Sequence, residues 1–204
     1  MENNAALVRC AWVGSDALYQ QYHDQEWGVP VREDRHLFEM LVLEGAQAGL
    51  NWITVLRKRE NYRAALDNFE PSLVANYSEA RLEALLQNPG LIRNKLKIKS
   101  LAQNAQAFLQ IQERHGSFSD WLWPYCEGQP IQNNFAHLGE VPAKTALSDR
   151  LSKDLKKAGF NFVGSTICYA FMQAVGMVND HTVDCFRHAP LKVRGQASGL
   201  GPEA

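Results

Sequence analysis

Residues 94–112 read NKLKIKSLAQNAQAFLQIQ, and their apolar positions repeat with a helical period. The repeat falls at i, i+4, i+7 and i+8, which is one stripe along an α-helix, and it is formed by Leu101, Ala105, Phe108 and Leu109. The stretch HLFEMLVLEGAQAG, residues 36–49, places Leu37, Met40, Leu41 and Ala48 on a common face in the same way. Both stretches predict long helices that bury one side.

Three further segments carry signals for helix starts and ends. Ser78 stands where a helix N-cap is expected, and that helix stops at Pro89-Gly90. The segments 148–160 and 165–176 resemble helices that end at Gly159 and Gly176. Alternating strand patterns are almost absent, and the best strand candidate, FNFVG at 160–164, is too short to count. The sequence therefore predicts an all-α fold.

Length and composition place limits on the class of protein. A chain of 204 residues suits one domain or two closely packed lobes. We expect residues 1–187 to form a single compact helical unit and the Gly- and Pro-rich segment 188–204 to be a disordered tail. No signal peptide or membrane span is apparent, and four cysteines without an export signal are typical of a reducing cytoplasm.

The formal net charge of −1 argues against a generally basic coat for nucleic acid. Local basic clusters occur at 57–63, 93–99 and 153–157. Solvated helix faces are the ordinary explanation for such clusters. Because phosphate binding needs local rather than global positive charge, the neutral total does not exclude DNA.

Two Cys/His pairs stand near opposite ends of the chain. NDHTVDC, residues 179–185, places His181 and Cys185 four positions apart, which is one face of a helix. Cys10 and His23 complete a Cys2His2 inventory that suits tetrahedral zinc, with His188 as a rival ligand. Two unrelated pairs can also arise by chance. Closing so long a loop costs about 4–5 kcal/mol, less than the roughly 10–16 kcal/mol of structural zinc sites, and four protein ligands would leave the metal no open position for chemistry.

Glu44 continues the apolar stripe of the 36–49 helix, seven residues after Leu37. A carboxylate on an apolar face is expensive unless something pairs with it. A glutamate at the stripe edge that reaches solvent, as we expect for Glu39, is the plainer interpretation. Nearby, however, are several aromatic rings that could instead be core: Trp12, Tyr19, Tyr22, Trp27 and Trp52. A carboxylate among such rings suits a flat cationic base.

The segment KKAGFNFVGSTICYAFM, residues 156–172, is typical of two helices joined by a tight glycine-bounded turn. Such a hairpin can direct backbone N–H groups at a phosphate. As a motif it is weak, because many helical proteins turn on glycine. Lys153, Lys156 and Lys157 just before it favour the DNA interpretation.

Four stretches together resemble the 3-methyladenine DNA glycosylase I family: residues 10–30, 37–63, 90–98 and 159–181. The similarity covers about residues 9–185, with the motifs in the same order and spacing. It implies a bacterial, cytoplasmic base-excision repair enzyme of the helix-hairpin-helix glycosylase superfamily, acting as a monomer on double-stranded DNA that contains alkylated adenine. It also implies one structural zinc ion, held by Cys10, His23, His181 and Cys185.

The resemblance assigns roles to individual residues. Glu44 matches the family's pocket glutamate, Tyr22 and Trp52 match the rings that stack on the base, and Trp12, Tyr19 and Trp27 match other pocket positions. Leu50, next to Gly49, matches the side chain that fills the hole in the duplex. The DNA-anchoring hairpin would comprise Gly159, Val163, Gly164 and Ser165.

Two departures from the superfamily bear on the chemistry. Thr166 occupies the region where many members carry a lysine nucleophile, so we expect no strand cleavage. The catalytic aspartate has no secure counterpart, and we interpret Asp180 only as a residue that orients the zinc histidine. The alternatives are a related glycosylase for other damaged bases and a non-enzymatic zinc-clasped DNA-binding module.

Overall fold

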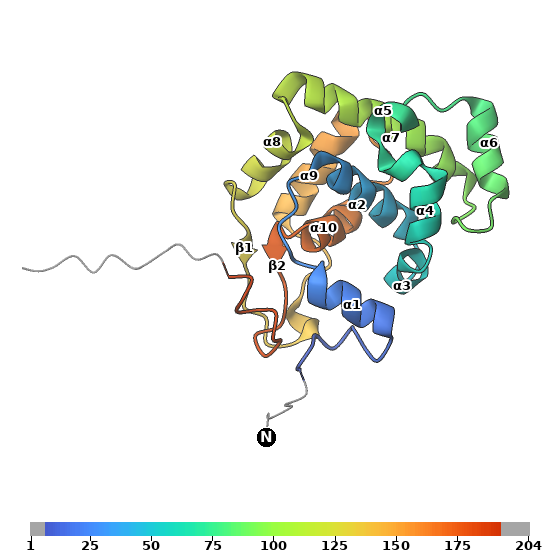
Figure 1. The fold of residues 1–204 in the computed structure, drawn as a ribbon. Coiled ribbons are helices and arrows are strands. Elements are labelled where there is room, and N and C mark those ends of the chain that lie inside the picture. The colour runs from blue at the N-terminus through green and yellow to red at the C-terminus, as the bar shows by residue number, and fades with distance from the viewer. Residues whose placement is uncertain (1–6, 193–204) are drawn as a thin grey trace, which may run out of the picture.

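The structure is a computed structural model that describes residues 7–192. Figure 1 shows helices packed around α2 and α10, and residues 7–192 contain one small pair of strands. The α-helices are α1 (Ala17–Gln25), α2 (Asp34–Gln47), α3 (Trp52–Leu56), α4 (Arg59–Ala65), α5 (Pro71–Val74), α6 (Glu79–Gln87), α7 (Lys95–His115), α8 (Phe118–Leu122), α9 (Ala146–Lys157) and α10 (Ser165–Ala174). Short 3-10 helices are η1 (Asp67–Phe69), η2 (Trp123–Cys126) and η3 (Leu138–Glu140).

The five helices expected from periodicity are confirmed, and their ends have local causes. Asn94 caps α7 by accepting from the N–H groups of Leu96 and Lys97. Ser78 caps α6 by accepting from the N–H of Arg81. Each such cap satisfies a backbone donor that the first helical turn leaves free. The helix α9 stops at Lys157, two residues before Gly159, which has a positive φ.

Helix α2 is the centre of the core. Every residue from Leu37 to Ala46 is buried, and the helix packs against α3, α7, α8 and α10. The expected exposure of Glu39 was wrong: its carboxylate is buried in ion pairs with Arg59 and Arg63. A carboxylate can be buried at this position because two guanidinium groups from α4 compensate its charge.

Gly45 does not break α2, which continues to Gln47. A Cβ at Gly45 would lie 3.3 Å from the Cβ of Phe162, so the glycine admits the turn between α9 and α10. Gly176 is tighter still, because a Cβ there would lie 2.5 Å from the backbone of Val29 and Pro30. Its φ of +72° and this contact both require glycine.

The segment 160–164, which was too short to count as a strand, is the turn between α9 and α10. The strands are β1 (Ile131–Gln132) and β2 (Val178–Asn179), which pair in parallel. The spacing of His181 and Cys185 would put them on one face of a helix. They lie instead in a loop closed by a turn from the N–H of Cys185 to the carbonyl of Thr182.

The segment before α1 and the loop after β2 lie side by side in the lower part of Figure 1. The N–H of Phe186 donates to the carbonyl of Val8 at 2.9 Å. Packed structure continues past position 187, since His188 is buried. The rest of the expected tail, 193–204, lies outside the described residues.

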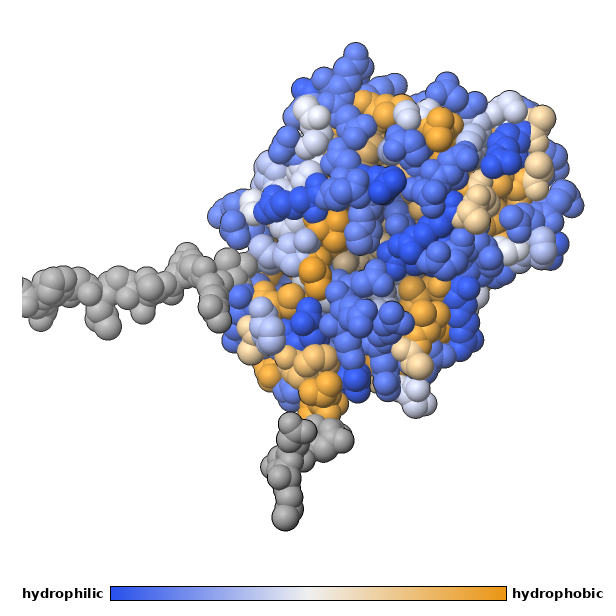
Figure 2. Space-filling view, viewed as in Figure 1, coloured by the Kyte–Doolittle hydropathy of each residue, from blue (hydrophilic) through white to orange (hydrophobic). Residues whose placement is uncertain are grey.

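The surface in Figure 2 is mostly polar, with separate apolar areas. The exposed large apolar side chains include Leu50, Leu96 and Leu138. Within residues 7–192, no helix combines the length and the apolar character that a membrane span needs.

Candidate active site and metal centre

Four predicted metal ligands converge between the two ends of the chain. Cys10 precedes α1, His23 lies on α1, and His181 and Cys185 lie in the loop after β2. Their ligand atoms all lie within 4.8 Å of one another, and all four residues are buried. The structure therefore brings together the two pairs that the sequence separates by more than 150 positions.

The spacing of these atoms fits a tetrahedral metal. His181 Nδ1 lies 3.5 Å from Cys10 Sγ and 3.4 Å from Cys185 Sγ, and His23 Nε2 lies 3.5 Å from Cys185 Sγ. A zinc ion with ordinary bond lengths separates sulfur from nitrogen by about 3.6 Å at the tetrahedral angle. The donor set also suits zinc, so the residues fit the ion.

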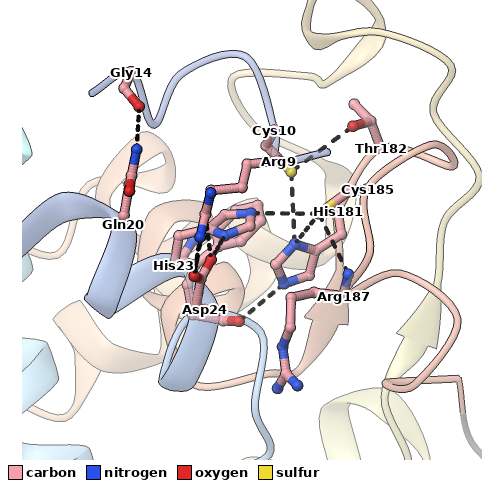
Figure 3. Close-up of polar contacts among 11 residues, drawn as sticks. Arg9, Cys10, Gly14, Gln20, His23, Asp24, His181, Thr182, Cys185 and Arg187 are labelled. Carbon is pink, nitrogen blue, oxygen red and sulfur yellow. Dashed lines mark hydrogen bonds and ion pairs between the residues drawn. The ribbon is translucent and has the colours of Figure 1, made fainter. Parts of the chain in front are cut away.

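The other ring nitrogen of each histidine has a fixed partner, as Figure 3 shows. His23 Nδ1 lies 2.8 Å from the carboxylate of Asp24, which Arg9 also binds. His181 Nε2 lies 3.0 Å from the carbonyl oxygen of Trp27. These contacts direct His23 Nε2 and His181 Nδ1 toward the sulfurs.

Asp180 forms no hydrogen bond with a ligand histidine. Its carboxylate accepts hydrogen bonds from Asn133, Tyr169 and Gln173. The proposed rival ligand, His188, instead contacts the carbonyl oxygen of Asn133 and lies outside the four-residue cluster.

The two cysteines of the cluster affect each other's ionisation. The hydrogen bond between the thiols raises the pKa of Cys10 and lowers the pKa of Cys185. The backbone N–H of Arg187 also points at Cys185 Sγ, at 3.5 Å. This N–H favours the thiolate form of Cys185.

Beside this cluster lies a cavity of about 280 Å³. All six residues predicted for a base pocket line it: Trp12, Tyr19, Tyr22, Trp27, Glu44 and Trp52. Sequence reasoning did not place the other lining residues at the pocket; they include Gln47, Leu138, Val141, Tyr169, Gln173 and Asp180. Gln47 could have been found, because it follows Glu44 by one helical turn. The loop of Leu138 and Val141 carried no pattern that pointed to a site.

Glu44 contributes a buried carboxyl group to the wall of the cavity. It is 3% exposed, and burial raises its pKa to about 8. Its Oε2 and the Nε1 of Trp52 are two of only three buried side-chain polar atoms in the described residues that lack a hydrogen-bond partner. A buried acceptor and a buried donor without partners are costly. A ligand that offers complementary groups would relieve this cost.

The aromatic walls meet at angles rather than in parallel. The ring centroids of Tyr22 and Trp52 are 5.4 Å apart with planes at 48°. Trp12 lies 4.9 Å from Trp27 with planes at 72°. A base sandwiched between two rings needs about 7 Å between them, twice a carbon–carbon contact. The arrangement therefore offers ring faces along the cavity wall rather than a slot between Tyr22 and Trp52.

The remaining predicted residues lie outside the cavity lining, in two turns. Gly49 has a φ of +80°, and Leu50 beside it is 41% exposed. In the other turn, Gly159 has a φ of +104° and Val163 is buried. Gly164 precedes α10 without a side-chain cap, and the hydroxyl of Ser165 contacts that of Ser148. The first N–H groups of α10 therefore keep the capacity to bind an anion.

Comparison with known proteins gives this geometry a family. The family model described as Methyladenine glycosylase matches residues 12–188, so the chain belongs to that family. DNA-3-methyladenine glycosylase 1 of Escherichia coli is 52% identical over 179 residues, 88% of this chain and 96% of its own. A crystal structure of 3-methyladenine DNA glycosylase I is similar with a TM-score of 0.87 and 53% identity, covering 89% of this chain and all of that one. A variant of 3-methyladenine DNA glycosylase I in complex with 3-methyladenine is similar with a TM-score of 0.86 and 34% identity, covering 88% and 97%.

Proposed function

We propose that the protein is a DNA repair glycosylase that hydrolyses the N-glycosidic bond of 3-methyladenine in alkylated DNA and leaves an abasic site. The observation that carries the proposal is Glu44, a buried carboxyl group with an unpartnered oxygen in the wall of an aromatic cavity. The family membership and the curated relatives support the reaction and the substrate.

The proposed chemistry follows from the charge of the damaged base. Methylation at N3 makes the adenine cationic, so the glycosidic bond is already weak. The nucleotide must first leave the helix, which costs a few kcal/mol and less for a damaged base. Inside the cavity, Glu44 accepts hydrogen bonds from the adenine edge, and the faces of Tyr22 and Trp52 contact the ring.

The bond electrons then pass to the base, which departs as neutral 3-methyladenine. Water adds to the anomeric carbon of the deoxyribose and loses one proton to solvent. Normal adenine lacks the positive charge, so Glu44 stabilises the bound base less. A methyl group alone is worth only about 1–3 kcal/mol, so the charge supplies the larger part of the selectivity.

We propose that the protein acts as a monomer and that the two turns outside the cavity bind the DNA duplex. Leu50 fills the space of the extracted nucleotide, and Gly49 allows the close approach. The turn of Gly159, Val163, Gly164 and Ser165 serves as a helix-hairpin-helix anchor that binds phosphate through backbone N–H groups of α10. Thr166 replaces a lysine nucleophile, so the enzyme is monofunctional. Because the proposed substrate is chromosomal DNA, we propose that the enzyme acts in the bacterial cytoplasm.

We further propose one structural zinc ion bound by Cys10, His23, His181 and Cys185. The metal would supply cross-linking of the two chain ends and no reaction chemistry, because four protein ligands fill a tetrahedral shell. The atomic spacing of 3.4–3.5 Å supports this assignment.

The test is release of bases from methylated duplex DNA, followed by chromatography. Glu44→Gln and Trp52→Ala should each lower kcat/KM for 3-methyladenine by on the order of 10–100-fold, roughly 1.4–2.8 kcal/mol of transition-state stabilisation. Glu113→Gln, at an exposed glutamate of α7, is the matched control and should leave it unchanged. Unchanged excision in both pocket variants would reject the site, and wild-type release of a different base would favour a related glycosylase. Binding of DNA without release of any base would instead favour a DNA-binding module.

A further inference from the structure

One face of α7 contacts both turns that are proposed to bind DNA. Lys97 reaches the end of α2, and Asn104 reaches the turn between α9 and α10. Seven residues on a helix make almost two full turns and about 10.5 Å of rise. The two side chains therefore project from nearly the same face at a fixed separation.

The ammonium group of Lys97 is used inside the protein. Its Nζ donates to the carbonyl of Ala46 at 2.9 Å and to that of Ala48 at 2.7 Å. Both carbonyls lie where α2 ends, and the chain then passes directly through Gly49 and Leu50 to Trp52. A cation at a helix C-terminus compensates the dipole and the free carbonyl groups there. Burial lowers the pKa of Lys97, consistent with an ammonium group turned toward the protein.

Asn104 forms a reciprocal pair with the backbone of the second turn. Its Nδ2 donates to the carbonyl of Asn161 at 3.1 Å, and its Oδ1 accepts from the N–H of Asn161 at 2.8 Å. Asn104 is 6% exposed, so these bonds lie in a largely dry environment. Gln103 adds a hydrogen bond to the carbonyl of Gly159 at 2.9 Å.

Helix α2, which leads into the first turn, also packs directly against the second turn. A Cβ at Gly45 would lie 3.3 Å from Phe162, so α2 and the turn are in close contact. The unfilled space among Gly45, Lys97, Asn104 and Phe162 is only about 20 Å³. The end of α2 and the 159–164 turn therefore have little freedom to shift relative to α7, because packed interiors yield poorly.

We propose that Lys97 and Asn104 are positioning residues that fix the Gly49–Leu50 turn and the 159–164 turn at one spacing, so that both meet the duplex at once. This inference rests on the proposed function, which supplies the roles of the two turns. Lys97 acts through Leu50 and does not itself bind phosphate, although it belongs to the basic cluster 93–99.

Lys97→Met tests this, because it keeps the aliphatic stem and removes the charge and the donors. It should lower kcat/KM on methylated duplex about tenfold, while the Kd for free 3-methyladenine, followed by tryptophan fluorescence, stays within twofold. The salt dependence of DNA binding should keep its slope, whereas a lost phosphate contact reduces the slope by about one. Lys99→Met removes a half-exposed lysine of the same helix and is the matched control, expected to keep kcat/KM within twofold.

A double-mutant cycle separates positioning from general damage. In a Leu50→Ala background, Lys97→Met should cost less than a further twofold, because its effect passes through Leu50. If Lys97→Met does not fold, Asn104→Ala tests the same proposal in the same assays. Full activity of both variants, a reduced salt slope for Lys97→Met, or equal losses in duplex excision and free-base binding would each overturn the proposal. An inactive wild-type protein would instead refute the proposed function.

Discussion

At neutral pH most Glu44 side chains carry a proton in the free protein, because burial raises the pKa to about 8. A cationic base beside the carboxyl group stabilises the ionised form and so lowers that pKa. Binding and ionisation are therefore coupled. Glu44 becomes a carboxylate when the ligand that needs a carboxylate arrives.

This coupling predicts a specific pH profile. The fraction of ionised Glu44 in the free protein rises with pH through about 8, so kcat/KM for 3-methyladenine release should rise and level off above that pH. The midpoint for kcat should lie lower, since it reports the complex. Glu44→Gln should abolish the rising limb. A wild-type kcat/KM that is flat from pH 6 to 9 would contradict the assignment.

The environment of a single side chain was predictable from sequence only where it did not depend on a partner far away in the chain. Glu44 was notable because a carboxylate continues an apolar stripe, although the stripe alone favoured an exposed side chain and the pocket role came from the family resemblance. The structure places it in the cavity wall. The predicted exposure of Glu39, on the same helix, was wrong because its partner Arg59 lies 20 positions further along the chain. Charge compensation between helices leaves no periodic signal in the sequence.

At the scale of elements, the long helices were predictable because amphipathic stripes and caps are local. Helix α1 and the short helices α3, α4, α5 and α8 were missed. Helices of only four to seven residues depend on tertiary packing rather than on their own periodicity. Pairing of β1 with β2 joins residues about 47 positions apart, such as Ile131 and Val178, and two-residue strands show no alternation.

The joint between α10 and β2 gives a prediction at this scale. Gly176→Ala should lower the free energy of unfolding by about 3 kcal/mol or more, because it combines a positive φ with a contact of 2.5 Å to the backbone of Val29 and Pro30. Gly128 has a similar φ of +77° and open space around it, so Gly128→Ala should cost only about 1 kcal/mol. Urea denaturation measures both. Equal losses would mean that the close approach at Gly176 is relieved by small shifts.

Across the whole molecule, the four-residue Cys/His cluster and the cavity share a wall. Trp27 lies edge-on to His181, with ring centroids 4.6 Å apart, and Trp12 lies edge-on to His23 at 5.3 Å. Cys10 and Thr182 line the cavity as well. Joining the chain ends therefore also fixes the tryptophans. From the sequence alone, the two Cys/His pairs could be either one metal site or two unrelated pairs, because Cys10 and Cys185 come close together only in the folded chain.

Loss of one ligand should act mainly on stability. Cys185→Ala is expected to remove bound zinc, measured by metal analysis, and to lower Tm by about 10 °C or more, since several kcal/mol of metal binding are lost. Protein that remains folded should keep most of its turnover. Cys126→Ala changes a buried thiol outside the cluster and should keep the metal and lose only a few degrees. Lost turnover with an unchanged Tm would show that the metal is not structural.

The most direct measurement is the crystal structure of the protein with 3-methyladenine. The account predicts that the base lies in the cavity, with its exocyclic amino group within hydrogen-bond distance of Glu44 Oε2 and its ring against the faces of Tyr22 and Trp52. A base bound elsewhere, or bound in the cavity with Glu44 still unpartnered, would contradict it.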